Sequence, residues 1–134
     1  MKEIRFRAWE KDYKYMNYKV MVGNVWDEEN YQWVDPKRVD YECAPGWKHF
    51  DENSNIELMQ YTGLKDKNGT EIYEGDIVLD KLNNEYGEVV FDEGCFLVLW
   101  QEGQNTVYQA TREFYIEVVG NVYENENFLR SEWL

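Results

Sequence analysis

Few residues in this chain have the types and spacing that zinc binding or nucleophilic catalysis requires. His49 is the single histidine, and neither cysteine lies at the spacing of zinc ligands from it. Cys95 with His49 is the one Cys/His combination that offers a thiol nucleophile and a base. Because Cys95 opens an apolar run that ends at Trp100, we expect both thiols, Cys43 and Cys95, to be small, buried and unreactive.

Three carboxylates close together in sequence, Glu71, Glu74 and Asp76, offer oxygen ligands for Mg²⁺. The alternative is a tight turn at Gly75 in which Asp76 accepts hydrogen bonds from backbone N–H groups. We favour the turn, because carboxylates are abundant in an acidic chain and their proximity carries little information. The glycine loops of nucleotide sites and the GxSxG motif of hydrolases are also missing from the sequence. We therefore assign no catalytic, cofactor-binding or metal-ligating residue, and a metal-dependent hydrolase is the least favoured hypothesis.

The stretch Asp66-Lys67-Asn68-Gly69 resembles the start of a calcium loop. Its glycine comes two positions early, however, and no Glu stands at the twelfth position. Asn-Gly instead predicts the turn of a β-hairpin, because both residues tolerate positive φ.

The elements that would position these residues are short strands separated by Gly, Asn or Asp. Their spacing of about ten residues is typical of a small antiparallel barrel or sandwich. The predicted strands are 3–8, 15–22, 31–34, 38–41, 56–61, 71–73, 77–79, 87–91, 95–100, 106–110 and 115–119. Turns are predicted at 62–64, 74–76 and 83–84.

Two segments depart from this pattern. The stretch 27–55 holds both prolines, and we expect exposed loops and lower order there. At the other end, Asn125 is predicted to cap a short C-terminal helix, because its side chain can accept a bond from a free backbone N–H. Phe128, Leu129 and Trp133 would form the apolar face of this helix.

Two nine-residue stretches are nearly the same, VGNVWDEEN at 22–30 and VGNVYENEN at 119–127. Their flanks differ, so we favour a local structural solution over duplication or a shared binding motif. Each Val is expected to end a strand, each Gly to allow a bulge or a close approach, and each Asn to bond its own backbone. If both stretches belong to one sheet, they are predicted to be neighbours.

The composition excludes several classes of protein. Acidic residues number 27 against 14 basic ones, and the net charge of −13 repels phosphate backbones, which argues against nucleic-acid binding. Aromatic residues make up 17%, too many for a disordered chain. No apolar run approaches the roughly 20 residues that span a membrane, and no signal peptide is recognised. We expect a reduced, cytoplasmic protein without membrane contact.

The chain has six tryptophans, more than one small core requires. Tryptophan is enriched at protein interfaces, so part of this set is expected at an interaction surface or an oligomer interface. Trp26, Trp33 and Trp47 fall in the irregular stretch and are the predicted interaction residues. The alternative is that they cover a thin β core.

Three blocks carry a resemblance to a known family: KEIRFRAWEKDYKYM at the start, LMQYTGLKDKNGTEIYEGDIV at 58–78 and IEVVGNVYENENFL at 116–129. In sequence, order and spacing they resemble the YopX family of small bacteriophage and prophage proteins, closely enough to admit identity with a Bacillus prophage member. The resemblance implies a mainly β fold, with small antiparallel sheets and an SH3-like barrel in the central and C-terminal part. It implies no activity, cofactor or catalytic residue.

We therefore expect a single domain, 1–134, with an N-terminal β region at 1–55, the SH3-like barrel at 56–122 and the C-terminal helix at 123–134. The first functional hypothesis is a phage accessory protein that acts through protein interaction rather than catalysis, as a homo-oligomer in the cytoplasm of a bacterial host cell. The second is an acidic regulator or DNA mimic that binds a host nucleic-acid-binding protein. Neither hypothesis involves direct contact with nucleic acid or a membrane.

Overall fold

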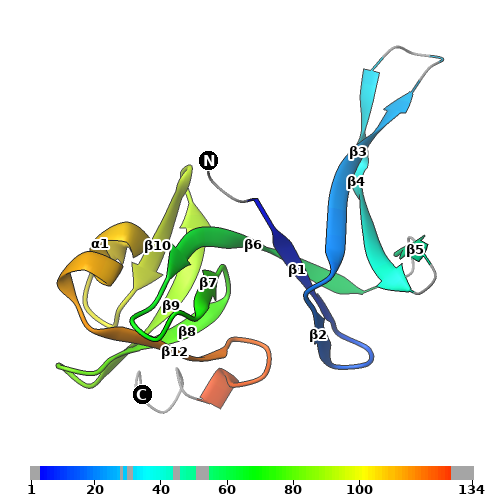
Figure 1. Cartoon of the computed structure of the whole chain (residues 1–134). Coiled ribbons are helices and arrows are strands. Elements are labelled where there is room, and N and C mark those ends of the chain that lie inside the picture. The colour runs from blue at the N-terminus through cyan, green and yellow to red at the C-terminus, as the bar shows by residue number, and fades with distance from the viewer. Residues whose placement is uncertain (1–3, 28, 30–31, 44–45, 51–54, 128–134) are drawn as a thin grey trace. The chain divides into compact units, whose positions relative to one another are not determined.

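The computed structural model describes residues 4–27, 29, 32–43, 46–50 and 55–127. Within these residues it contains twelve strands and one α-helix, so the predicted mainly β fold of small antiparallel sheets is confirmed (Figure 1). The chain divides into two compact units: residues 5–59, and residues 60–134 together with 1–4. We call them the N-unit and the C-unit and describe each by itself.

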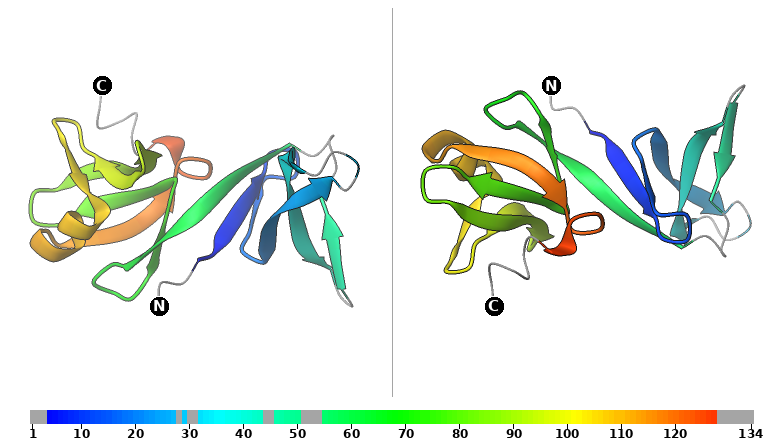
Figure 2. Two further views of the ribbon diagram at one scale, coloured as in Figure 1. Left: turned by 90° about the horizontal axis from the view of Figure 1, so that it is seen from above. Right: turned by 90° about the horizontal axis from the view of Figure 1, so that it is seen from below.

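The C-unit is built around a five-stranded antiparallel sheet that curls into a half-barrel (Figure 1, Figure 2). Its order is β11-β10-β9-β8-β12. The strands are β8 (Asp76–Asp80), β9 (Glu85–Asp92), β10 (Cys95–Leu99), β11 (Gln104–Thr106) and β12 (Ile116–Asn121). A fully buried cluster forms the core of the unit: Ile72, Val78, Val89, Val98, Val107, Ala110 and Ile116. These apolar side chains supply the main stabilisation of the unit.

The helix α1 (Val107–Glu113) corrects the strand predicted at 106–110. Thr106 caps it, because its side-chain oxygen accepts a hydrogen bond from the Gln109 N–H at 3.0 Å. Val107 and Ala110, three positions apart, both lie buried in the core cluster. The Thr-x-x-Gln spacing is the sequence signature of a helix start, and it outweighs the β preference of the Thr-Val-Tyr run.

The predicted C-terminal helix is described at its first residues alone. Asn125 stands directly before Glu126 and Asn127, which are helical. Its Oδ1 accepts the N–H of Asn121, on the other side of the turn, so the predicted helix cap stays a prediction. Phe128, Leu129 and Trp133 lie outside the described residues.

The β6–β7 hairpin also belongs largely to the C-unit. β6 (Ile56–Lys65) passes from the N-unit into the C-unit and pairs there with β7 (Glu71–Tyr73). The turn predicted at 62–64 is wrong, because the strand continues through these residues with a register shift between Tyr61 and Lys65. Gly63 has a φ of +86°, a value that favours glycine. The glycine therefore allows a bulge within the strand and not the turn that was predicted.

In the N-unit, β1 (Phe6–Glu10) pairs with β2 (Tyr15–Asn17), and a separate antiparallel sheet has the order β3-β4-β5. Its strands are β3 (Val20–Asp27), β4 (Gln32–Cys43) and β5 (Gly46–His49). The loops expected in 27–55 are therefore wrong for most of the described part of that stretch. The two strands predicted at 31–34 and 38–41 are one strand that includes Pro36. Proline is tolerated there because the β3–β4 register is irregular between Gly23 and Val25, opposite Pro36.

The two similar nine-residue stretches, 22–30 and 119–127, have a similar local structure but lie in different sheets. Each contains a register irregularity at its glycine, between Gly23 and Val25 in β3 and between Val118 and Gly120 in β12, which confirms the predicted bulges. The prediction that the stretches are neighbours is wrong, because β3 and β12 lie in separate sheets. The first copy also continues as strand to Asp27.

The second copy closes a tight turn. The Asn121 Oδ1 accepts hydrogen bonds from the N–H groups of Tyr123 and Glu124, both at 3.0 Å, as predicted for an Asn that bonds its own backbone. The Asn125 side chain folds back over Gly120 and its Oδ1 accepts the Asn121 N–H at 3.3 Å. Gly120 is thus the position where the absence of a side chain lets Asn125 approach.

Replacing Gly120 with alanine is expected to lower the free energy of unfolding by about 1–2 kcal/mol. A Cβ there would overlap the Asn125 Oδ1 and stand 2.6 Å from its Cγ, so the Asn125 side chain must move and its hydrogen bond to Asn121 is lost. Urea unfolding measures the change. Gly46→Ala, where nothing lies within 4 Å of the new Cβ, is the matched control, and equal effects at the two glycines would refute this account.

Candidate functional site

An open groove of about 660 Å³ lies within the C-unit. Three segments line it: 62–64 in β6, 94–96 at the start of β10, and 106–108 at the start of α1. The segments are far apart in sequence and meet because the sheet places β10 beside β11, which leads directly into α1. Concave, largely apolar surfaces of this size are typical of binding sites.

Hydrogen bonds fix the β6 wall of the groove. The Thr62 hydroxyl donates to the Ile72 carbonyl at 2.7 Å and accepts the Leu64 N–H at 3.2 Å. These bonds hold the bulge at Gly63 against β7, so this wall is part of the folded hairpin rather than a free loop.

The β10 wall follows a two-residue hairpin turn. Asp92 pairs with Cys95 across the hairpin, and the two residues between them, Glu93 and Gly94, have φ values of +49° and +80°. Positive φ at both central residues is the geometry whose twist matches two antiparallel strands. The turn therefore presents Cys95 and Phe96 at the groove in a fixed register.

Exposed aromatic rings lie beside the groove. Phe91 is 50% exposed and its ring centroid lies 4.9 Å from that of Phe96, which lines the groove. Tyr108, on the helix side, is 56% exposed, and the Arg112 guanidinium carbon lies 5.0 Å from its ring centroid. Exposed aromatic side chains around an apolar depression are a common feature of protein-binding surfaces.

Cys95 is an exposed free thiol, which corrects the expectation that it is buried. It belongs to the C-unit and His49 to the N-unit, and the side chain of His49 lies outside the described part of the chain. The side chain of Cys43 lies outside it as well. We therefore treat Cys95 as a residue that lines the groove.

Two of the three carboxylates considered for Mg²⁺, those of Glu74 and Asp76, accept hydrogen bonds from backbone N–H groups. The Asp76 Oδ2 accepts the Tyr73 N–H at 2.8 Å, and Gly75 has a φ of +89°, which confirms the predicted tight turn. The Glu74 Oε1 accepts the Gln60 N–H at 3.3 Å. Among the described residues, no group of three His, Cys, Asp or Glu side chains is placed to hold a metal ion.

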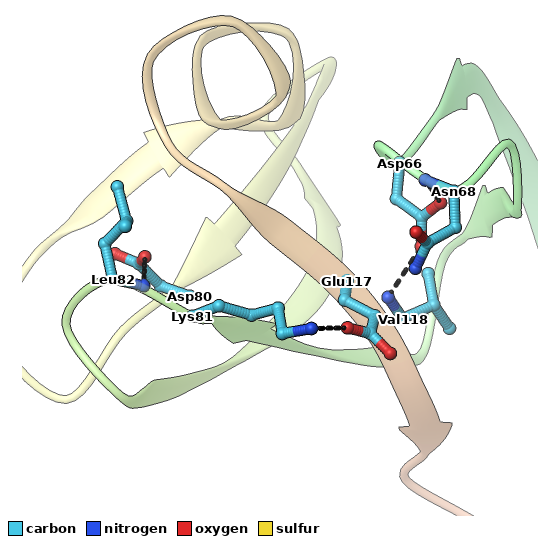
Figure 3. A network of polar contacts seen from close by, with 7 residues as sticks. All are labelled: Asp66, Asn68, Asp80, Lys81, Leu82, Glu117 and Val118. Atoms are coloured by element: carbon cyan, nitrogen blue, oxygen red, sulfur yellow. Dashed lines mark hydrogen bonds and ion pairs between the residues drawn. The ribbon is translucent and has the colours of Figure 1, made fainter.

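Asp66 closes the predicted Asn-Gly hairpin and also joins it to the main sheet (Figure 3). Its Oδ1 accepts the N–H groups of Asn68 and Thr70, each at 2.9 Å, and Gly69 has a φ of +84°. Its Oδ2 accepts the Val118 N–H of β12, also at 2.9 Å. This carboxylate thus satisfies backbone donors of two elements, the hairpin turn and β12.

The ion pair in Figure 3 is a surface feature. Lys81 Nζ lies 2.9 Å from the Glu117 Oε2, and the pKa of Lys81 is raised chiefly by its hydrogen bond to Glu117 and by the negative charge of that carboxylate. Both side chains are partly hydrated, so the pair contributes little to stability.

The carboxyl of Glu88 in β9 is expected to make the stability of the chain depend on pH. Burial raises the pKa of its carboxyl, because the charged form loses hydration. The folded chain therefore holds this proton more tightly than the unfolded chain. The resulting penalty is absent below the unfolded pKa and grows as pH rises through the folded pKa.

Glu88→Gln is accordingly expected to raise the free energy of unfolding at pH 7 by about 0.5 kcal/mol, a small gain because the side chain stays half hydrated. At pH 3, where both side chains are neutral, the gain should vanish. Urea unfolding of both proteins at the two pH values measures this, and a gain that does not change with pH would contradict the assignment.

The predicted interaction residues lie in the three-stranded sheet of the N-unit. Trp26 in β3 and Trp33 in β4 are directly paired across the hairpin, and Trp47 in β5 pairs with Glu42. Their side chains lie outside the described part of the chain. Their role in an interface stays a prediction.

Among the described residues, no helix is long and apolar enough to cross a membrane.

Comparison with known proteins identifies a family and two related structures. The family model described as YopX protein matches residues 5–130. No curated protein matches the chain. The crystal structure of protein EF1440 from Enterococcus faecalis is similar, with a TM-score of 0.62 and 25% identity over 96% of this chain and 99% of that one.

The X-ray structure of protein yopX from Bacillus subtilis has a TM-score of 0.57 and 20% identity over 93% of this chain and 95% of that one. At this identity the two chains are distinct proteins with a common fold. The resemblance seen in the sequence is therefore one of family, and not identity with that Bacillus protein.

Proposed function

The chain belongs to the YopX protein family, and we propose that it is a non-catalytic accessory protein that acts by binding another protein. Because the chain resembles phage and prophage proteins, the proposed location is the cytoplasm of a bacterial host cell. The groove of the C-unit is the observation that carries this proposal, because it combines a preformed apolar depression with exposed Phe91 and Tyr108 beside it.

The charge of the C-unit favours a basic partner, as in the hypothesis of an acidic regulator. Sixteen acidic residues stand against six basic ones in this unit, a net of −10, while the N-unit has eleven against eight, a net of −3. A field of this sign attracts basic proteins and repels nucleic acid. A host nucleic-acid-binding protein is therefore the favoured class of partner.

Two finer features belong to the same proposal. The curled five-stranded sheet supports an SH3-like barrel in 56–122, of which it would form the larger part. The paired Trp26 and Trp33 and the neighbouring β5 with Trp47 support a homo-oligomer interface on the N-unit. Light scattering of the full chain at high concentration tests the second feature, and a strict monomer would remove it.

The test of the proposed function is chemical crosslinking in host cells that express the tagged full chain, followed by capture and mass spectrometry. We expect one basic protein to be recovered reproducibly, in an amount comparable to the chain. Recovery of no such protein would overturn this proposal. The alternative of a metal-dependent hydrolase is removed if titration of the purified chain with Mg²⁺ and Mn²⁺ gives no heat.

A further inference from the structure

We propose that the groove formed by 62–64, 94–96 and 106–108 docks a basic peptide segment of a partner protein, which inserts an apolar side chain between β6, β10 and α1. The inference rests on the proposed function and deepens it by naming the surface and the kind of segment that binds there.

The floor of the groove is preformed. Leu64 and Phe96 are partly buried and pack against the core cluster, and Val107 is 1% exposed and belongs to it. An apolar side chain that enters the groove thus meets a surface already fixed by the folding of the C-unit. Docking then costs little reorganisation, which preserves the gain from burying the inserted side chain.

The size of the groove fits a peptide segment. A space of about 660 Å³ that is open to solvent accommodates a large apolar side chain with adjoining backbone. The rings of Phe91 and Tyr108 lie beside it from two different elements, β9 and α1. They extend the apolar surface in the way that peptide-binding grooves use aromatic walls.

The charges near the groove favour a positively charged peptide segment. Asp92 and the exposed Glu93 stand at the hairpin turn that forms one wall, and the C-unit as a whole has a net charge of −10. Arg112 is a basic side chain on the helix side, where it lies over the Tyr108 ring. Basic residues of the segment are therefore placed toward the Asp92–Glu93 turn, with the apolar residue in the groove.

The same charges disfavour other occupants. A second copy of this chain has a net charge of −13 and would bring like charge against the turn. Nucleic acid is disfavoured for the same reason. A basic segment gains from the field at every distance of approach, so complementarity raises its association rate as well as its affinity.

The test uses a library of random 12-residue peptides displayed on phage and selected on the full chain. We expect enriched peptides to contain at least two Lys or Arg residues and one large apolar residue. Synthetic peptides of the enriched sequences are then measured by fluorescence anisotropy at low and high salt, and binding should weaken as salt rises.

Matched variants separate the groove from general attraction between opposite charges. Cys95→Trp fills the groove and is expected to weaken binding about tenfold. Glu93→Lys is expected to weaken binding about fivefold. Glu102→Lys makes the same charge change in the turn at the opposite end of β10 and should change binding less than twofold.

A second measurement uses the wild-type chain, so its result does not depend on whether the variants fold. Cys95 is an exposed thiol in the wall of the groove, so a saturating bound peptide should slow its reaction with a maleimide about fivefold or more. Peptide mapping by mass spectrometry distinguishes Cys95 from Cys43.

Each outcome bears on a definite statement. Peptides that bind equally to wild type and Cys95→Trp, and do not protect Cys95, overturn the groove but leave the proposed function intact. A library without enriched basic peptides also overturns the inference. If crosslinking in cells nevertheless recovers a partner, the proposed function stands and its surface lies elsewhere.

Discussion

Asp66→Ala is expected to lower the free energy of unfolding by about 3 kcal/mol, since three backbone N–H groups lose their charged acceptor at once. Asp66 is a buried residue, 7% exposed, so water does not readily replace its carboxylate. Two of the donors, Asn68 and Thr70, are within the hairpin turn, and the third, Val118, belongs to the edge strand β12. Loss of the third bond also removes a link between the hairpin and the five-stranded sheet.

Two further substitutions make this result specific. Asp66→Asn keeps one carbonyl oxygen but turns an NH₂ group toward one set of donors, so about half of the full loss is expected. Asp92→Ala removes a carboxylate of the same type from an exposed turn position and should change stability by less than about 0.5 kcal/mol. Urea unfolding followed by circular dichroism measures all three. If Asp66→Ala and Asp92→Ala lower the free energy of unfolding equally, the three hydrogen bonds to Asp66 do not stabilise the chain.

The roles of the hairpin residues were predictable because their signals are local. Asn68-Gly69 predicts positive φ at the turn, and Glu74-Gly75-Asp76 predicts a turn whose carboxylate binds backbone N–H groups. Both are observed. The bond from Val118 to Asp66 spans 52 positions, and no local pattern indicates which side chain completes an edge strand.

The helix α1 was missed because two local signals disagree. The run Thr106-Val107-Tyr108 has high β propensity, whereas the Thr106 to Gln109 spacing and the buried pair Val107 and Ala110 favour a helix. Tertiary burial decides between them, because one helical face packs both small apolar residues into the core. The spacing of the cap was the signal available in the sequence.

The groove was beyond sequence reasoning for a different reason. Its three segments, 62–64, 94–96 and 106–108, each have a readable local feature: a glycine bulge, a two-residue turn and a helix cap. What brings them together is the strand order of the sheet, which periodicity does not fix. Cys95 shows the same limit, because an uninterrupted apolar run gives no alternation from which its exposure follows.

Gly87→Ala is expected to lower the free energy of unfolding by about 2–3 kcal/mol, against the direction of strand propensity. A Cβ at this buried position in β9 would stand 2.6 Å from the Val98 Cγ1 and 2.8 Å from the Trp100 Cε3. Val98 is fully buried. The Trp100 ring is held by its Nε1–H bond to the Asn105 Oδ1 at 2.8 Å and packs edge-on against Phe114, so neither neighbour can yield easily.

A rescue experiment identifies the clash as the cause. Trp100→Leu alone destabilises the chain, because it removes the Asn105 bond and the contact with Phe114. If the clash dominates, adding Gly87→Ala to Trp100→Leu costs about 1–2 kcal/mol less than adding it to the wild type. At Gly46, where the new Cβ meets nothing within 4 Å, alanine should be neutral or slightly stabilising. Additive losses in the double variant would show that a cause other than Trp100 sets the requirement for glycine at position 87.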